Sequence, residues 1–248
     1  MKTCNPARYT APLRTLRILT KWTLCLLFFL IIATRTSAST TVDIVNAALD
    51  ELSSQRLDHW RFSAIERTNS QVLRMVYHPV RNNVGRIELV SINGREPTAK
   101  ESDRFAKSHP PRMAGESSQH GYALGDLITP DTLQWHSSED GIDTFHFTPR
   151  FAFAGITRSD YPMKGALRFD SQSRQLISFD IRTTTSFRPK RGTRVDQFYL
   201  TIDFDAHANG TLLTQRIRTR LEGKAFWLFT LIQDIEIFFY DYLPTSQP

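Results

Sequence analysis

Cysteine is absent from the sequence after residue 38. Both cysteines of the chain, Cys4 and Cys25, lie in its first 38 residues. The part of the chain that follows therefore has no disulfide and no thiol nucleophile, and cysteine-based zinc sites cannot be built from it. About 210 residues remain, which are enough to bury a single stable core without such cross-links.

The chain also lacks an excess of charge outside its N-terminal segment. In total it carries 31 Lys and Arg against 25 Asp and Glu, for a sequence pI of about 9.5. Six of these bases and no acid lie in the first 38 residues, so the remainder carries 25 residues of each sign. A pI this high would otherwise suggest nucleic-acid binding, but a balanced domain does not. We therefore expect no nucleic-acid partner.

Signatures of common catalytic centres are missing as well. The sequence has no glycine-rich phosphate loop, no G-x-S-x-G elbow and no H-E-x-x-H motif. His136 and His146 lie on two expected strands joined by a turn at 140–141. A tight turn there would point the two side chains to opposite faces and make them poor partners for one metal ion. The sequence thus predicts a protein that is not an enzyme and has neither a metal nor a cofactor.

No apolar run reaches the roughly 20 residues that a membrane-spanning helix needs. One shorter run, residues 22–33, is preceded by a lysine and followed by an arginine and the small residues 36–38. A basic flank, a short apolar core and small residues after it are typical of a secretory signal peptide. We predict a signal peptide over residues 1–38, cleavage before Ser39 and a soluble periplasmic protein. An uncleaved N-terminal anchor is the alternative.

Helical periodicity occurs in two places after residue 38. Apolar residues recur at helical spacing over residues 42–52 and predict an amphipathic helix over about 41–54. A capping box from Thr98 to Glu101 begins a second, polar helix. That helix should end near Lys107, because two prolines follow.

Most of the remaining sequence alternates between apolar and polar residues, which predicts β-strands. Three short strands are expected before the second helix, at residues 59–67, 72–78 and 85–92. A loop rich in Pro, Gly and Ser at 108–121 is either a lid or a segment without a role, and a brief helical turn at 123–128 follows it. The rest is a meander of strands whose turns we expect at 140–141, 171–173, 209–210 and 222–223.

The last expected strand, residues 225–242, is apolar at alternate positions and at most of the positions between them. Neither side of it looks suited to water, so we expect both faces to be covered. A strand of this kind needs a large curved sheet to lie on and a further layer packed against the sheet.

The register of the last two hairpins follows from assuming two-residue turns. A type I′ turn at 209–210 places Ile202 opposite Ile217, which pairs apolar residues on one face. A turn at 222–223 places Ile217 opposite Leu228.

This register also predicts a candidate ligand-binding face on the other side of the sheet. It lays Trp227 beside Arg218 and Phe229 beside Arg216, with Leu231 next along the strand. The aromatic stripe is either the lining of an apolar cavity or ordinary core packed against the first helix. Arginines bury their stems and keep their heads solvated more easily at a cavity mouth than in a dry interior, which favours the cavity.

A basic loop, residues 188–194, is the second candidate site. It carries four bases and no acid. Such a run either attracts anionic head groups or is an ordinary solvated hairpin loop.

The order of elements resembles the outer-membrane lipoprotein carrier (LolA-like) superfamily of periplasmic proteins. The resemblance lies in the signal peptide, the N-terminal amphipathic helix, the short strands, the polar helical insertion and the long meander ending in a two-faced strand. Residues 91–98 (SINGREPT) and 169–182 (FDSQSRQLISFDIR) are similar to segments of exported bacterial proteins of this kind.

The resemblance implies an α+β fold in which a strongly curved antiparallel sheet, an open half-barrel, is packed with a few short helices. It would form a single domain over residues 39–248. The implied function is to hold an acyl chain, lipid or lipoprotein in an apolar cavity, with only transient membrane contact. The alternative is an envelope interaction or sensor module with a self-filled core and an envelope protein as partner.

Overall fold

The computed structural model describes residues 42–50, 60–79, 84–109, 112–113, 124–129, 131–153, 156–158, 160–226 and 229–245. The chain divides into two compact units, residues 1–43 and 44–248, and the fold below is that of the second. The predicted signal peptide, residues 1–38, lies outside the described residues. Among the described residues, no helix is both long and apolar enough to cross a bilayer.

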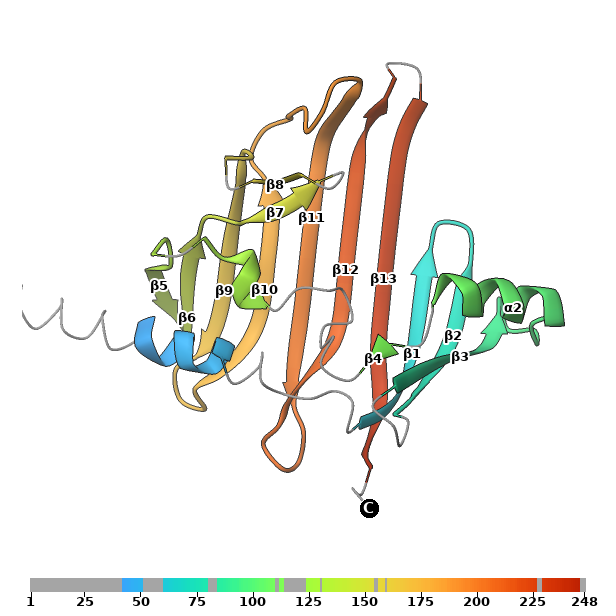
Figure 1. Ribbon diagram of the computed structural model, residues 1–248. Coiled ribbons are helices and arrows are strands. Elements are labelled where there is room, and N and C mark those ends of the chain that lie inside the picture. Colours follow the sequence, from blue (N-terminus) through green and yellow to red (C-terminus); the bar gives the residue numbers. More distant parts are fainter. Residues whose placement is uncertain are drawn as a thin grey trace, which may run out of the picture. The chain divides into compact units, whose positions relative to one another are not determined.

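An antiparallel sheet of eleven strands makes up most of the second unit (Figure 1). From one edge to the middle, its strands are β4 (Arg112–Met113), β3 (Val84–Ile92), β2 (Val72–His78), β1 (Trp60–Thr68) and β13 (Phe229–Pro244). The sheet continues with β12 (Leu212–Ala225), β11 (Thr193–Ala206), β10 (Gln175–Thr183), β9 (Met163–Asp170), β6 (Ile142–Phe147) and β5 (Gln134–Glu139). A separate hairpin consists of β7 (Phe151–Phe153) and β8 (Ile156–Arg158).

The sheet is open, because no pairing within the described residues joins the edge strands β4 and β5. The predicted class, a mostly antiparallel sheet with a few short helices, is therefore confirmed. The three early strands begin and end within a residue of the expected positions. Sequence patterns did not indicate that the last strand, β13, pairs with the first strand, β1, and so lies inside the sheet.

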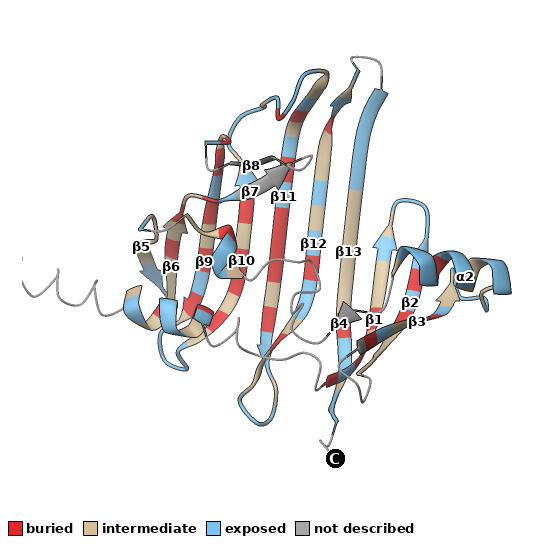
Figure 2. Ribbon diagram, viewed as in Figure 1, coloured by how far each residue is buried: buried red, intermediate tan, exposed pale blue. Residues whose placement is uncertain are grey.

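The strand register assigns each residue to one of two faces, because directly opposed residues of antiparallel strands point the same way. One face, which we call the core face, carries the most deeply buried side chains, among them Phe145, Leu167, Phe179, Ile181, Leu200, Ile202 and Ile217. The other, the polar face, carries exposed arginines on β9, β10 and β12, namely Arg168, Arg182, Arg216, Arg218 and Arg220. Figure 2 shows the buried residues concentrated on β9, β10 and β11.

The β11–β12 hairpin confirms the predicted pairing of Ile202 with Ile217, although its turn differs from the predicted one. Of the two turn residues, Gly210 has a positive φ of 84° and Asn209 does not, so the turn is not type I′. The loop is one residue longer, and a β-bulge that skips Gln215 restores the expected register beyond it.

Helices are short in the described part of the second unit. Residues 42–50 are helical within the predicted span of 41–54, and Val45 and Leu49 on this helix are buried. Helix α2 (Ala99–Ser108) begins at the predicted capping box, and a 3-10 helix, η2 (Leu124–Leu127), follows where a helical turn was expected. Residues 51–54 lie outside the described part of the chain.

The expected loop at 108–121 contains a short piece of regular structure. Arg112 and Met113 form β4 and pair with Gly85 and Val84 of β3. A two-residue strand has no periodicity to detect, so the sequence could not reveal it. Residues 114–121 lie outside the described part of the chain.

Candidate functional site

The candidate site on β13 rests on a register that the structure corrects. Strand β12 does not turn at Glu222 and Gly223 but continues to Ala225, and Ile217 pairs with Ile237 rather than with Leu228. A Cβ atom at Gly223 would lie 2.2 Å from the backbone oxygen of Arg194 on β11. This glycine therefore permits a close approach between two strands instead of forming a turn.

The correction moves the predicted residues to opposite faces, because the register is displaced by an odd number of residues. Phe229 and Leu231 lie opposite Ala225 and Gly223 on the core face. Arg216 and Arg218 lie on the polar face. The prediction that these arginines flank the aromatic residues is therefore wrong, and Trp227 lies outside the described residues.

The two arginines pair with acids on the neighbouring strands. The guanidinium of Arg216 is 2.7 Å from Asp203 on β11 and 3.7 Å from Glu236 on β13. The hydrogen bond to Asp203 raises the pKa of Arg216. Arg218 reaches Asp234 at 4.0 Å. Exposed pairs of this kind add little stability, and they form a cross-strand ladder of charge on the polar face.

The expectation that β13 is covered on both faces is wrong. On the polar face, Ile232 is exposed and Phe238 is half-buried, with the guanidinium of Arg67 5.1 Å from its ring centroid. The guanidinium of this arginine lies over the ring where a second layer of structure was expected. The residue types alone predicted a covering layer on this face. The structure instead leaves Ile232 exposed and places the guanidinium of Arg67 over Phe238.

On the core face of β13, apolar residues form a strip whose exposure falls along the strand. We define the apolar strip as Phe229, Leu231, Ile235, Ile237 and Phe239. Phe229 is 63% exposed, Leu231 39%, the two isoleucines are half-buried and Phe239 is 7% exposed. One polar residue on the same face, Gln233, interrupts the sequence of apolar side chains. The strip thus connects the exposed start of β13 with a buried residue, Phe239, beyond which the end of the strand is again mostly exposed (Figure 2).

The partners of the strip explain this gradient. Strand β1 pairs with β13 only from Ile235 onward, so the first part of β13 has β12 as its neighbour on one side alone among the described strands. On that side, Phe229 and Leu231 face Ala225 and Gly223, whose side chains are too small to cover them. Large apolar residues beside small ones leave apolar surface open to contact.

No protein-family model, curated protein or solved structure gives a significant match to this chain. The resemblance to lipoprotein carriers therefore remains a prediction from the pattern of elements.

His136 and His146, which the sequence analysis judged poor partners for one metal ion, lie next to each other. The rings of His136 and His146 stack with centroids 3.9 Å apart, because a β-bulge at His136 shifts the β5–β6 register between Trp135 and Ser137. The prediction of opposite faces is wrong, since the tight turn was found but the bulge was not foreseen. Within the described residues, no group of three or more His, Cys, Asp or Glu side chains could hold a metal ion.

Sequence reasoning did not single out Phe226, which occupies the turn between β12 and β13. Its backbone φ is 50° and its side chain is exposed. The apolar run that begins at this residue was assigned to the interior of a strand. A turn within the run became visible only once β12 was found to extend to Ala225.

Proposed function

We propose that this protein is an exported periplasmic binding protein that holds an acyl chain of a lipid or lipoprotein along the apolar strip of β13. The acyl chain would lie against Leu231 and Ile235 and reach toward the buried end of the strip at Phe239. This proposal retains the predicted ligand roles of Phe229 and Leu231. It does not use Arg216 and Arg218, which lie on the other face.

The graded exposure of the strip is the observation that carries the proposal. A side chain that belongs only to the core is buried, and one that belongs only to the surface is usually polar. Apolar residues that pass from exposed to buried on one face of a sheet, here with the single interruption at Gln233, provide what an extended hydrocarbon chain needs, a surface to lie on with one end inside the protein. Burying this surface under a ligand would be favourable at about 25 cal/mol per Å².

The order of elements supports the same proposal. In the resemblance to lipoprotein carriers, a strongly curved sheet forms an open half-barrel around the ligand, and we propose that curvature for the open sheet found here. A sheet of this size with a largely buried core face and a partly exposed strip is compatible with an open half-barrel. Export to the periplasm is part of the proposal and rests on the predicted signal peptide.

Two adjacent substitutions test the proposal. Leu231→Asn removes an apolar side chain from the strip, whereas Ile232→Asn removes one from the polar face of the same strand. Delipidated protein is titrated with dansyl-labelled undecanoic acid and the dansyl emission is recorded. We expect Leu231→Asn to weaken binding roughly tenfold, within the scale set by burying a leucine side chain, and Ile232→Asn to leave binding unchanged.

The stability of the same variants separates a ligand surface from ordinary core. Both side chains are exposed in the free protein, so each substitution should change the free energy of unfolding by no more than about 0.5 kcal/mol. Equal binding by both variants, or no binding by the wild type, would contradict the proposal. Native mass spectrometry of protein purified from its own cell envelope gives a second reading, since bound lipid should add its mass.

A further inference from the structure

The turn at Phe226 combines backbone strain with an exposed aromatic side chain. A φ of 50° is unusual for a residue with a bulky side chain, and it is easier for glycine or asparagine. The side chain is 70% exposed, so packing within the protein does not compensate for the strain. Strained residues of this kind occur most often at sites that make contact with something else.

Apolar side chains surround this turn on both faces of the hairpin. We define the hairpin tip as Phe226, Phe229 and Ile232. Phe229 points to the core face, and Ile232, 61% exposed, points to the polar face. Apolar residues on both faces suit a medium that surrounds the hairpin, rather than a partner that covers one side of it.

The basic loop lies directly against the tip. The backbone N–H of Phe226 donates to the carbonyl oxygen of Gly192 at 2.6 Å, and a Cβ atom at Gly192 would be 3.5 Å from the Phe226 ring. Lys190 and Arg191 of this loop are exposed, as is Lys224, just before the turn. Segments 186–195 and 223–233 together contain five bases and no acid, and one of these bases, Arg194, pairs with Asp196 at 2.6 Å. The exposed positive charge beside the tip therefore comes from Lys190, Arg191 and Lys224.

We propose that the hairpin tip and the basic loop together form a docking surface for an anionic lipid bilayer. Aromatic side chains are favourable at the interface between head groups and acyl chains, and bases beside them are attracted to anionic head groups. Either element alone is common on protein surfaces, and their direct contact is what identifies the surface. The proposal does not depend on whether the apolar strip holds an acyl chain.

The charge of the surface favours a bilayer over a second copy of the chain. Another copy would bring the same excess of positive charge to the contact, and like charges oppose association. A bilayer containing phosphatidylglycerol supplies negative charge and an apolar interior at the same surface. The edge of β13 before Ile235, which has no partner among the described strands, nevertheless makes self-association an outcome that the test must detect.

The first variant, Phe226→Asn, separates docking from folding. Asparagine accepts a positive φ more readily than phenylalanine, so the unfolding midpoint in urea should stay unchanged or rise. Binding is measured by co-sedimentation with vesicles of equal parts phosphatidylcholine and phosphatidylglycerol, and with phosphatidylcholine vesicles alone. We expect the wild type to bind only the anionic vesicles and Phe226→Asn to bind them roughly tenfold more weakly.

The second variant, Lys190→Gln with Arg191→Gln, tests the electrostatic part. Each base near an anionic membrane contributes roughly a fivefold change in affinity, so the pair should lower binding by on the order of 25-fold. The control, Lys100→Gln with Arg104→Gln, removes the same charges from exposed positions on α2 and should bind as the wild type does. Raising the salt from about 0.01 M to about 1 M should abolish the difference between the two double variants.

Several outcomes would overturn the proposal. These are no binding to anionic vesicles at low salt, equal binding by Phe226→Asn and the wild type, and an equal loss in both double variants. A concentration-dependent dimer that Phe226→Asn abolishes, seen by sedimentation equilibrium without vesicles, would assign the tip to self-association instead. The dansyl-acid titration of Phe226→Asn should match that of the wild type, so that failure of docking and failure of acyl-chain binding remain distinguishable.

Discussion

The stacked pair of His136 and His146 depends on a single bulged residue. Burial lowers the pKa of His146 below its usual value, and the charges of His136, Lys164 and Arg182 lower it further. A proton on His146 would therefore lie in a positively charged part of the polar face. The neutral form of this imidazole fits the folded protein better than the charged form.

Replacing His136 with asparagine should raise the pKa of His146. The substitution removes one of the charges that oppose protonation, while the effects of burial, Lys164 and Arg182 remain. The measurement is an NMR titration of the imidazole resonances. His78→Asn, on β2, serves as the control and should leave the titration of His146 unchanged.

The sign of the linked stability follows from the direction of the shift. Because the folded pKa of His146 is depressed, the unfolded chain binds the proton more readily, and stability is lost as the pH falls from about 6.5 toward the folded pKa. His136→Asn should make that loss smaller between about pH 7 and pH 5. A pKa of His146 that stays the same or falls in this variant would contradict the account.

At the level of single residues, the sequence predicted the turns better than the exceptions to regular pairing. Asp140 and Gly141 both have positive φ, which fits the tight hairpin turn that such a pair indicates. Gly223 was mistaken for the same signal. Its actual role depends on the backbone of another strand, and no local pattern contains that information.

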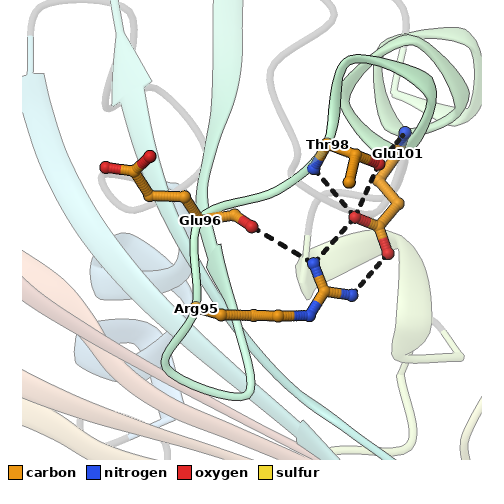
Figure 3. Close-up of polar contacts among 4 residues, drawn as sticks. All are labelled: Arg95, Glu96, Thr98 and Glu101. Carbon is orange, nitrogen blue, oxygen red and sulfur yellow. Dashed lines mark hydrogen bonds and ion pairs between the residues drawn. The ribbon is translucent and has the colours of Figure 1, made fainter.

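Helix α2 shows how a local motif determines an element. The Thr98 hydroxyl accepts a hydrogen bond from the Glu101 N–H, and the Glu101 carboxylate accepts one from the Thr98 N–H at 2.9 Å (Figure 3). Arg95 donates to both oxygens of that carboxylate, at 2.9 and 2.6 Å. These contacts hold the pKa of Glu101 well below its usual range, and the hydrogen bond from Arg95 has the largest effect.

Thr98→Ala should destabilise α2 by about 1 kcal/mol, because the cap loses its acceptor for the first turn. Loss of protection against amide hydrogen exchange within residues 99–108 is the most direct measurement, since a short helix at the periphery can open without unfolding the sheet. The control, Ser102→Ala, removes a hydroxyl from the helix interior and should not lower protection. Equal protection in both variants would mean that the cap contributes nothing to the helix.

The longer strands were predictable as elements, but their register was predictable only in part. The turn at 140–141 was correct, but the bulge at His136 shifted the β5–β6 register beyond it. The β11–β12 pairing survived an error in turn length because the bulge at Gln215 compensated for it. The β12–β13 pairing had no such compensation. One mistaken turn reversed the faces of the strand and separated Phe229 from Arg216.

At the scale of the whole molecule, residue types predicted a large antiparallel sheet but not the neighbours of each strand. Apolar residues on both sides of β13 were interpreted as a need for two covering layers. The fold instead places β13 beside the shorter β1, so that part of the strand extends past its neighbour and stays exposed. Exposure of this kind is set by the relative lengths of strands far apart in sequence, which alternation along one strand does not encode.

This exposed part of β13 makes a prediction about the stability of the whole molecule. If the apolar strip binds an acyl chain only in the folded state, excess ligand must stabilise the protein by about 2.7 kcal/mol at a free concentration 100 times the Kd. For a domain of this size, that corresponds to a rise in Tm of roughly 5 to 10 °C. Differential scanning calorimetry with undecanoic acid should show this rise for the wild type and for Ile232→Asn, and at the same ligand concentration a smaller rise for Leu231→Asn. A strip that is filled by the protein's own side chains has no surface left for the ligand, so an unchanged Tm in all three proteins would indicate a self-filled core.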